Sequence, residues 1–394
     1  MGATRKMKAK ERETSAHFAE HVERFRECFS GKLELGPPPD DLYREIAQIA
    51  LAGPGVVALR GLLRQSPKGL AEAPQETLAA AARIALGFRT LFNLHEVRSM
   101  LRPTGVREDT PYWRIVLEHC AGGNLQAVMD EYVHVLRESM GLIDAGAVRV
   151  AHELSSEISE VLSLGAATLR LDEFSWGPVR GLRREGDMGV RCRYALRFGD
   201  LRSEDRTVAR RGDVRQAFNS PFRPFILATT SIGQEGLDFH LYCHSVCHWN
   251  LPSNPVDLEQ REGRVNRYKC HAIRRSVARD LGLPAMSLLK GDPWQALFAA
   301  AVSNRQDEQT ELVPWWVYDG PGSVKIERIV PMLPLSRETQ RLPALKEALA
   351  AYRLVFGQPR QEDLLQYVLE RLDQDEIDRE ALRRCQIDLS PPIR

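Results

Sequence analysis

The sequence predicts an α/β lobe built on a parallel sheet and flanked by mainly helical N-terminal and C-terminal regions. Apolar side chains recur at helical spacing from Ser15 to Leu162, alternate with polar ones after Ala166, and return to helical spacing after Leu281. Short apolar runs also alternate with helical patterns in the middle segment, as in α/β proteins. We therefore place a mainly helical region at residues 1–165, the lobe at 166–280, and a mostly helical extension with a short hairpin at 281–394.

Length and composition limit the class of protein. The chain has 394 residues, enough for two or three domains, and its net charge of +1 gives no global field for nucleic acid or a membrane. Any such role must come from local basic patches. The seven cysteines are odd in number and scattered, unlike a disulfide framework, and the polar N-terminus lacks a signal peptide's apolar core. No run approaches about 18 apolar residues. We expect a soluble, cytoplasmic protein without membrane contact.

Three N-terminal segments have clear helix signals. SAHFAEHVERFRECFSG spaces Phe18, Val22 and Phe25 at helical intervals and stops at a glycine. PDDLYREIAQIALAGPG follows acidic cap candidates and ends at a Gly-Pro-Gly breaker, and NLQAVMDEYVHVLRESMG runs from an asparagine cap to a glycine.

Strand patterns begin after Ala166. ATLRLDEF and RCRYALRF alternate apolar and polar residues, with glycine-rich, basic connections between them. FILAT (Phe225–Thr229) is a continuous apolar run, typical of a strand buried on both faces of a parallel sheet. SVCHWNLP is predicted as another strand and NPVDLEQREGRVNRY as the helix after it. Further on, LVPWWVYDGPGSVKIERIV predicts two strands around a turn. Helices at Leu342–Phe356 and Gln361–Leu372 are expected to pack on the preceding domain.

The stretch EQREGRVNR gathers three arginines and a glycine. If the helix begins with Ser253 or Asn254 as N-cap and Pro255 in its first turn, Leu258 and Val265 share one face. The opposite face carries Gln260, Gly263, Arg264 and Arg267. Guanidinium groups match phosphate oxygens with paired hydrogen bonds, so this face is a candidate phosphate-binding surface. The alternative is a solvated helix face.

The loop TSIGQEGLDF (Thr230–Phe239) follows the predicted FILAT strand and closes on Asp238. Ligands of open α/β sheets bind at the carboxyl ends of strands, where this loop must lie. Glycines permit close backbone approach, and an aspartate suits a ribose hydroxyl. The alternative is an ordinary loop whose aspartate bonds its own backbone.

Taken together, TTSIGQEGLDFHLYCHSVCHWNLPSNPVDLEQREGRVNRY resembles motifs V and VI of superfamily 2 helicases. The resemblance is closest to the Swi/Snf and RapA-like translocases, whose second, RecA-like lobe carries an EGxxF…LPxNPxxLEQRxGRxxR pattern. The strong resemblance covers Phe222 to His271. RTVARRGDVRQAFNSP resembles, more loosely, the basic helix and Phe-Asn before motif V, and nothing else in the chain aligns with the family.

The resemblance implies a role for each matching residue around ATP and nucleic acid. Arg264 and Arg267 would be catalytic arginine fingers that reach the γ-phosphate. Gly236 and Asp238 would lie beside the nucleotide ribose, and Gln260 would couple the lobes. Thr230 and Ser231 would contact the nucleic-acid backbone, with DNA favoured over RNA.

The sequence departs from the family in lacking the P-loop and the acidic Walker B strand. LDEF (Leu171–Phe174) lacks an apolar lead-in, and MDEY (Met129–Tyr132) lies in a helical pattern. ATP would therefore need a separate P-loop lobe, which would also supply the Mg²⁺ ligands. We expect a fragment or split subunit of a helicase or translocase, inactive alone. The alternative is a non-catalytic nucleic-acid-binding or scaffolding module.

Two other features have competing interpretations. YCHSVCHW and the downstream Cys-His pair supply zinc-ligand residue types, but neighbouring strand residues point to opposite faces, so we predict no metal site. Trp315 and Trp316 fit core or hairpin packing, with base stacking as the alternative. His134, and Glu118, His119 and Cys120 in LEHC, lack partners at a catalytic spacing and are interpreted as structural.

Overall fold

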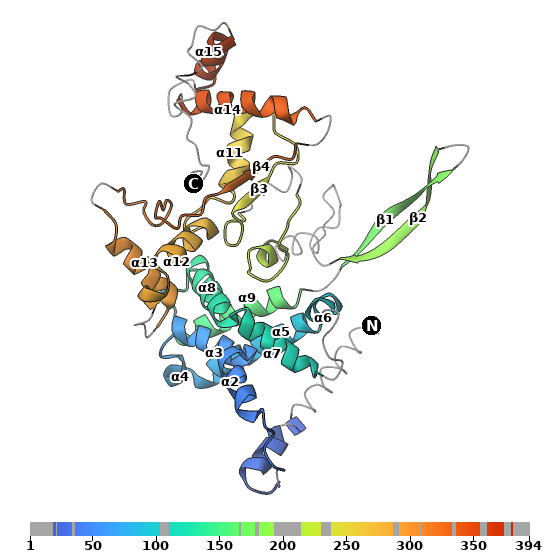
Figure 1. Ribbon diagram of the computed structural model, residues 1–394, viewed down its shortest axis with the longest axis vertical. Helices are drawn as coiled ribbons and strands as arrows, with labels where there is room; N and C mark the ends of the chain where they lie inside the picture. The colour runs from blue at the N-terminus through green and yellow to red at the C-terminus, as the bar shows by residue number, and fades with distance from the viewer. Residues whose placement is uncertain are drawn as a thin grey trace. The chain divides into compact units, whose positions relative to one another are not determined.

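The computed structural model divides the chain into two compact units, Met1–Leu51 and Ala52–Arg394. The residues it describes are 19–20, 22–33, 36–102, 110–164, 167–177, 181–192, 214–229, 238–286, 291–306, 309–332, 336–354, 361–373 and 380 (Figure 1). The first unit contains a helix at residues 22–29 and most of α2 (Leu42–Ala52), and Phe25 and Phe29 pair at 4.9 Å between ring centroids. A helix is thus confirmed in each of the two predicted segments, and the predicted start of the first lies outside the described residues.

Seven helices are described in the first part of the second unit, within residues 54–102 and 110–162. Pro54 and Pro74 occupy first-turn positions of two of them, where a missing N–H costs nothing. Asn124 caps another by accepting a hydrogen bond from the Ala127 N–H, and that helix stops before Gly141, whose φ of 66° favours glycine. The helices are α3 (Pro54–Gln65), α4 (Gly69–Glu72), α5 (Pro74–Phe92), α6 (His95–Leu101), α7 (Tyr112–Gly122), α8 (Leu125–Ser139) and α9 (Ala147–Leu162).

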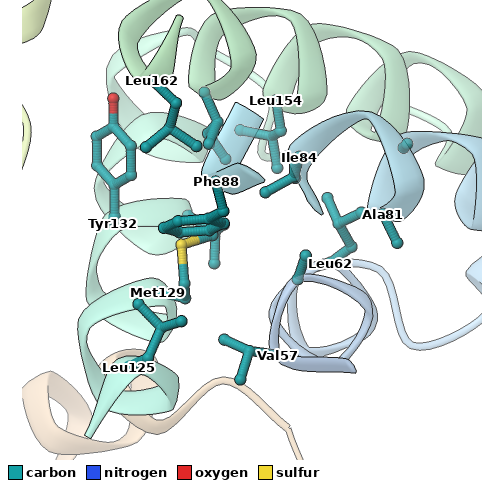
Figure 2. Packing of buried hydrophobic residues seen from close by; sticks show 14 of the residues in the cluster. Val57, Leu62, Ala81, Ile84, Phe88, Leu125, Met129, Tyr132, Leu154 and Leu162 are labelled. Carbon is teal, nitrogen blue, oxygen red and sulfur yellow. The ribbon is translucent and has the colours of Figure 1, made fainter. Parts of the chain in front are cut away.

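These helices enclose one apolar core. Figure 2 shows Phe88 of α5, Met129 of α8 and Leu154 of α9 pointing into the same interior. A Cβ atom on Gly87 would lie 3.0 Å from the Leu162 side chain, so this glycine permits the close approach of α5 and α9. The helical pattern of the sequence is therefore an amphipathic one that buries its apolar face here.

Residues Leu42–Gln65 have the length and apolar composition of a membrane span, which the sequence analysis did not anticipate. The stretch is interrupted at Gly53, whose ψ of 124° is extended rather than helical. Its second half, α3, contributes Val57, Ala58 and Leu62 to the core. Buried core helices often pass the same composition test, so this one is weak evidence for a membrane.

β1 (Ala167–Gly177) and β2 (Gly181–Cys192) form an antiparallel hairpin. The first predicted strand is confirmed, but the basic segment predicted as a connection is itself most of β2. Backbone pairing runs from Ala167–Cys192 to Gly177–Gly181. Of RCRYALRF, only Arg191 and Cys192 lie within the described residues.

The second sheet of the described chain pairs β3 (Ser245–Cys247) with β4 (Glu327–Ile329) in parallel. The strand predicted in SVCHWNLP is confirmed, although it is short. The FILAT strand is wrong: all five residues are described, none is in a strand, and Phe225 and Ile226 are 73% and 87% exposed. An apolar run alone does not supply a neighbouring strand.

The hairpin predicted near Trp315 is also wrong. Residues 309–332 are all described, and their single strand, β4, pairs with β3 instead of folding back. The Asp-Gly-Pro-Gly turn lies against α12 (His271–Met286), where a Cβ on Gly322 would be 2.8 Å from the Arg279 Cβ. Its glycines thus serve helix packing rather than a hairpin.

Further helices lie in the described lobe and its extension. α11 (Pro255–Gly263) follows β3, α13 (Pro293–Ser303) packs on α12, and α14 (Glu338–Leu354) packs on α11 through Leu345 and Leu349 against Leu258. α15 (Gln361–Asp373) packs on α14. The two predicted C-terminal helices and the packing of the first on the lobe are confirmed. The predicted boundaries at 165 and 280 stay a prediction.

One face of α8 joins the helical core to the lobe. The Arg274 guanidinium is buried and donates from Nε to the Glu131 carboxylate (2.8 Å) and from Nη1 to the Lys269 carbonyl (2.8 Å). Its Nη2 donates to the Leu241 carbonyl. One and two turns further along α8, His134 contacts Asp292 with 2.5 Å between Nδ1 and Oδ2, and Glu138 pairs with Lys269. His134 thus has two acidic neighbours, Asp292 and Glu138, that the sequence did not reveal, and its structural role stays a prediction.

We predict that Glu131→Gln destabilises the protein by about 2–4 kcal/mol, because it leaves a buried guanidinium without its counter-charge. Denaturant unfolding measures the change. Glu118→Gln, at an exposed position of α7, is the matched control and should shift stability by about 0.5 kcal/mol or less. Equal effects of the two substitutions would show that Glu131 does not balance Arg274.

Candidate functional site

The site begins with the short helix α11. The Asn254 side chain caps it by accepting from the Val256 N–H at 2.9 Å, which selects one of the two predicted caps. Leu258 and Val265 are buried, as the predicted inner face requires. The helix nevertheless ends at Gly263, so Arg264 and Arg267 follow it in turns rather than lying on a continuous helical face.

Three charged residues of the same motif are used in packing. Glu259 pairs with Arg353 of α14, with 2.6 Å between Oε1 and Nε, and Arg261 donates to the Asn250 carbonyl at 3.0 Å. Glu262 accepts from Arg328 Nη2 at 2.7 Å and contacts His248 Nε2 at 3.1 Å, which ties α11 to both strands of the small sheet. These residues hold the helix in place.

The Glu262 carboxyl is strongly stabilised in its charged form. Burial alone raises its pKa, but the hydrogen bonds and positive charges of Arg328 and His248 outweigh burial and lower the pKa to about 2. The charged Glu262 carboxylate, bound to Arg328 and His248, therefore fixes α11 against the small sheet at neutral pH.

Arg264 and Arg267 converge on one carboxylate. Arg267 Nε donates to Asp238 Oδ1 at 3.1 Å, and Arg264 Nη1 lies 4.0 Å from the same oxygen. All three side chains are partly exposed. The Arg267 guanidinium also lies beside Gly263, where an added Cβ would be 3.7 Å from Nη1. Two guanidiniums thus share a single anionic partner at the surface.

The backbone around Asp238 is held from two sides. Asn219 Nδ2 donates to the Asp238 carbonyl at 2.8 Å, and the Phe239 N–H donates to the Arg264 carbonyl at 2.9 Å. The His271 N–H donates to the His240 carbonyl at 2.9 Å, and burial lowers the pKa of His240 to about 4, so that this ring is neutral at physiological pH. The loop is therefore fixed against the segment that bears the arginines.

The structure brings together some of the predicted site residues. Asp238, Gly263, Arg264 and Arg267 are adjacent, while Gln260 is exposed on α11. Thr230, Ser231 and Gly236 lie outside the described residues. The ribose-binding and nucleic-acid-binding roles of these residues stay predictions.

Sequence reasoning missed two positioning residues. Asn219 belongs to the Phe-Asn that was noted only as a loose resemblance, and its side chain supports Asp238. Arg274 lies beyond the residues to which the resemblance assigned a role. Its neighbours Ile273 and Val277 are buried at helical spacing, and this spacing was the available signal that the arginine between them points inward.

The remaining candidates are the histidines and cysteines of metal-ligand type and the two tryptophans. No group of three or more metal-ligating side chains gathers within the described ranges. The His244 and His271 rings lie 5.4 Å apart and are tilted by 47°, and Arg275 Nη1 lies 3.1 Å from His244 Nε2. Trp315 packs in the apolar cluster of α12 and α13, and Trp316 is partly exposed. Cys120 is buried in the helical core.

Residues 191–269 match the helicase conserved C-terminal domain. The matched segment contains Asp238, Arg264 and Arg267, so the arginine and aspartate cluster lies within a segment similar to a helicase C-terminal domain. The match implies a RecA-like fold for this part of the chain, and helicase domains generally bind nucleic acid. It does not distinguish a Swi/Snf or RapA-like subtype. No curated protein and no solved structure matches the chain.

We predict that the Glu262 interactions contribute stability that is lost in acid. Because the folded-state pKa is about 2 and the ordinary value is 4.5, the contribution is complete above pH 4.5 and disappears as pH falls through 2. It amounts to about 3 kcal/mol. Unfolding of the wild type and Glu262→Gln should therefore differ most at pH 7 and converge near pH 2. A difference that is constant with pH would contradict the assignment.

The interactions of Asp238 with Arg264 and Arg267 should contribute little to the stability of the protein. All three side chains are partly exposed, so Asp238→Ala is expected to change the free energy of unfolding by about 1 kcal/mol or less. A loss as large as that of Glu262→Gln would mean that this cluster is structural rather than a surface available to a ligand.

Proposed function

We propose that this chain is the C-terminal motor lobe of an ATP-dependent superfamily 2 nucleic-acid helicase or translocase, completed by a separate lobe that carries the P-loop. The observation that carries the proposal is the Arg264, Arg267 and Asp238 cluster. The other charged residues of the motif pair with the rest of the fold, whereas these two arginines share one carboxylate at the surface. We assign the Swi/Snf and RapA-like subtype to it, because the sequence of the motif resembles the pattern of that subtype.

The residues present fit a nucleotide phosphate. Two guanidiniums offer paired donors to phosphate oxygens, and Gly263 beside Arg267 leaves room for close approach. Asp238 competes for both arginines, so phosphate binding would replace this single anion with a more highly charged one. When bound, ATP supplies the phosphoanhydride bond whose hydrolysis drives the motor, and the arginines stabilise the charge on the transferred group.

Magnesium would be held elsewhere. The described residues gather no suitable cluster of carboxylates, and the sequence has no P-loop to cradle the phosphates. We therefore assign the Mg²⁺ ligands and the remaining phosphate contacts to the partner lobe. Nucleic acid, with DNA favoured over RNA, would cross both lobes near Thr230 and Ser231, in a cytoplasmic setting.

The test is ATP hydrolysis by this chain combined with the P-loop protein that co-purifies with it or is encoded beside it. Arg267→Ala and Arg264→Ala should each lower turnover by about 10³-fold, because an arginine finger contributes on that scale. Arg149→Ala, at an exposed position of α9, is the matched control and should retain full turnover. Circular dichroism checks that each variant is folded.

Unchanged turnover in both finger variants would overturn the assignment. Nucleic-acid binding that persists without hydrolysis under any combination would instead favour the non-catalytic binding module.

A further inference from the structure

A stack of three aromatic rings leads from the core of the lobe to its surface. Phe298 of α13 is buried, and Trp315 stacks on it at 5.4 Å with an interplanar angle of 4°. Tyr268 stacks on Trp315 at 5.9 Å and 19°. These distances are typical of offset stacking. The stack therefore presents its last ring, that of Tyr268, at the outer end.

That outer end is open to solvent. Tyr268 is 45% exposed, and Trp316, which meets it edge-on at 6.2 Å and 64°, is 43% exposed. An interior tryptophan and phenylalanine support one side, while a second indole forms a side wall. The two exposed rings form a contiguous apolar surface, and such surfaces, unlike single exposed apolar residues, are candidate ligand-binding features.

The backbone holds this platform rigidly. The Lys269 N–H donates to the Trp315 carbonyl at 2.8 Å, and Lys269 has a φ of 45°, in the left-handed region that non-glycine residues seldom adopt. Its ammonium pairs with Glu138 and lies 5.0 Å from the Trp315 ring centre. The turn is thus anchored to both the aromatic stack and α8.

The platform directly follows the proposed finger Arg267 in the chain. Arg264, Arg267 and the exposed Tyr268 ring therefore all lie within residues 264–268. Phosphates and a flat, apolar base are the two chemical parts of a nucleotide. Partial burial and Glu138 raise the pKa of the Tyr268 hydroxyl, so the ring stays neutral near pH 7.

We propose that Tyr268, with Trp316 as side wall, stacks on the adenine of the nucleotide whose phosphates face Arg264 and Arg267. The inference rests on the proposed function and adds a base-binding surface to it. Stacking on aromatic side chains is tolerant of the base, so the platform would raise affinity for nucleotides in general rather than select one base strongly.

The experiment compares ATP with tripolyphosphate, which has the phosphates without the base, by calorimetric titration of the full chain in Mg²⁺ buffer. Wild type should bind ATP about tenfold more tightly than tripolyphosphate, the scale of one stacked base. Tyr268→Ala should remove this preference and leave tripolyphosphate binding unchanged, while Tyr268→Phe should retain it. Tyr43→Ala, at an exposed tyrosine of α2, is the matched control.

Equal affinity for ATP and tripolyphosphate in the wild type, or no binding of ATP, would overturn the stacking proposal. If ATP and tripolyphosphate bind with equal affinity and Arg267→Ala weakens the binding of both ligands, the proposed function survives without the base platform. If Arg267→Ala weakens neither, the finger assignment fails as well. A base preference seen only when single-stranded and abasic oligonucleotides are compared would overturn the assignment to a free nucleotide.

Discussion

The arrangement of the site depends on one buried cation. The Arg274 guanidinium is 0% exposed and must be paired where it lies, since an unpaired buried charge costs several kcal/mol. Its partners are the Glu131 carboxylate on α8, the Leu241 carbonyl after Asp238, and the Lys269 carbonyl after Arg267. A single side chain therefore joins the helical core, the aspartate loop and the arginine turn. Tyr242 and Phe222 extend the same junction by packing on Tyr132 at 6.0 and 5.7 Å.

The motif that carries the arginines combines packing residues and candidate ligand-binding residues within a few positions. Glu259, Arg261 and Glu262 bind the neighbouring helix, loop and strand, and Leu258 is buried beneath them. These contacts hold α11 in a fixed position, with one face exposed to solvent. Arg264 and Arg267 are then presented at its end with Asp238 between them, and a more highly charged anion could displace this carboxylate. A side chain that acts on a phosphate must be held in a defined position, and the contacts of Glu259, Arg261 and Glu262 hold the segment that bears the arginines.

The sequence predicted those parts of the fold that depend on local signals. The Asn124 and Asn254 caps, the buried Leu258 and Val265, and the helices of the core follow from spacing and capping, which act over a few residues. The FILAT strand and the hairpin near Trp315 were wrong because a strand needs a partner, and β4 pairs with the distant β3, which periodicity does not reveal. β2 pairs with its neighbour β1, but its basic, glycine-containing sequence does not alternate apolar and polar residues. The same holds for the site: the motif identified Asp238, Arg264 and Arg267, but their meeting follows from turns after Gly263. The pairing of Arg274 with Glu131 spans 143 residues and has no local signature.

The most direct measurement is ATP turnover by this chain alone, with and without single-stranded and double-stranded DNA and RNA. If the chain supplies arginine fingers but neither a P-loop nor Mg²⁺ ligands, we expect no turnover above background under any of these conditions. Nucleic-acid-stimulated turnover that disappears in Arg267→Ala would contradict it, because the chain would then contain a complete phosphate and magnesium site of its own.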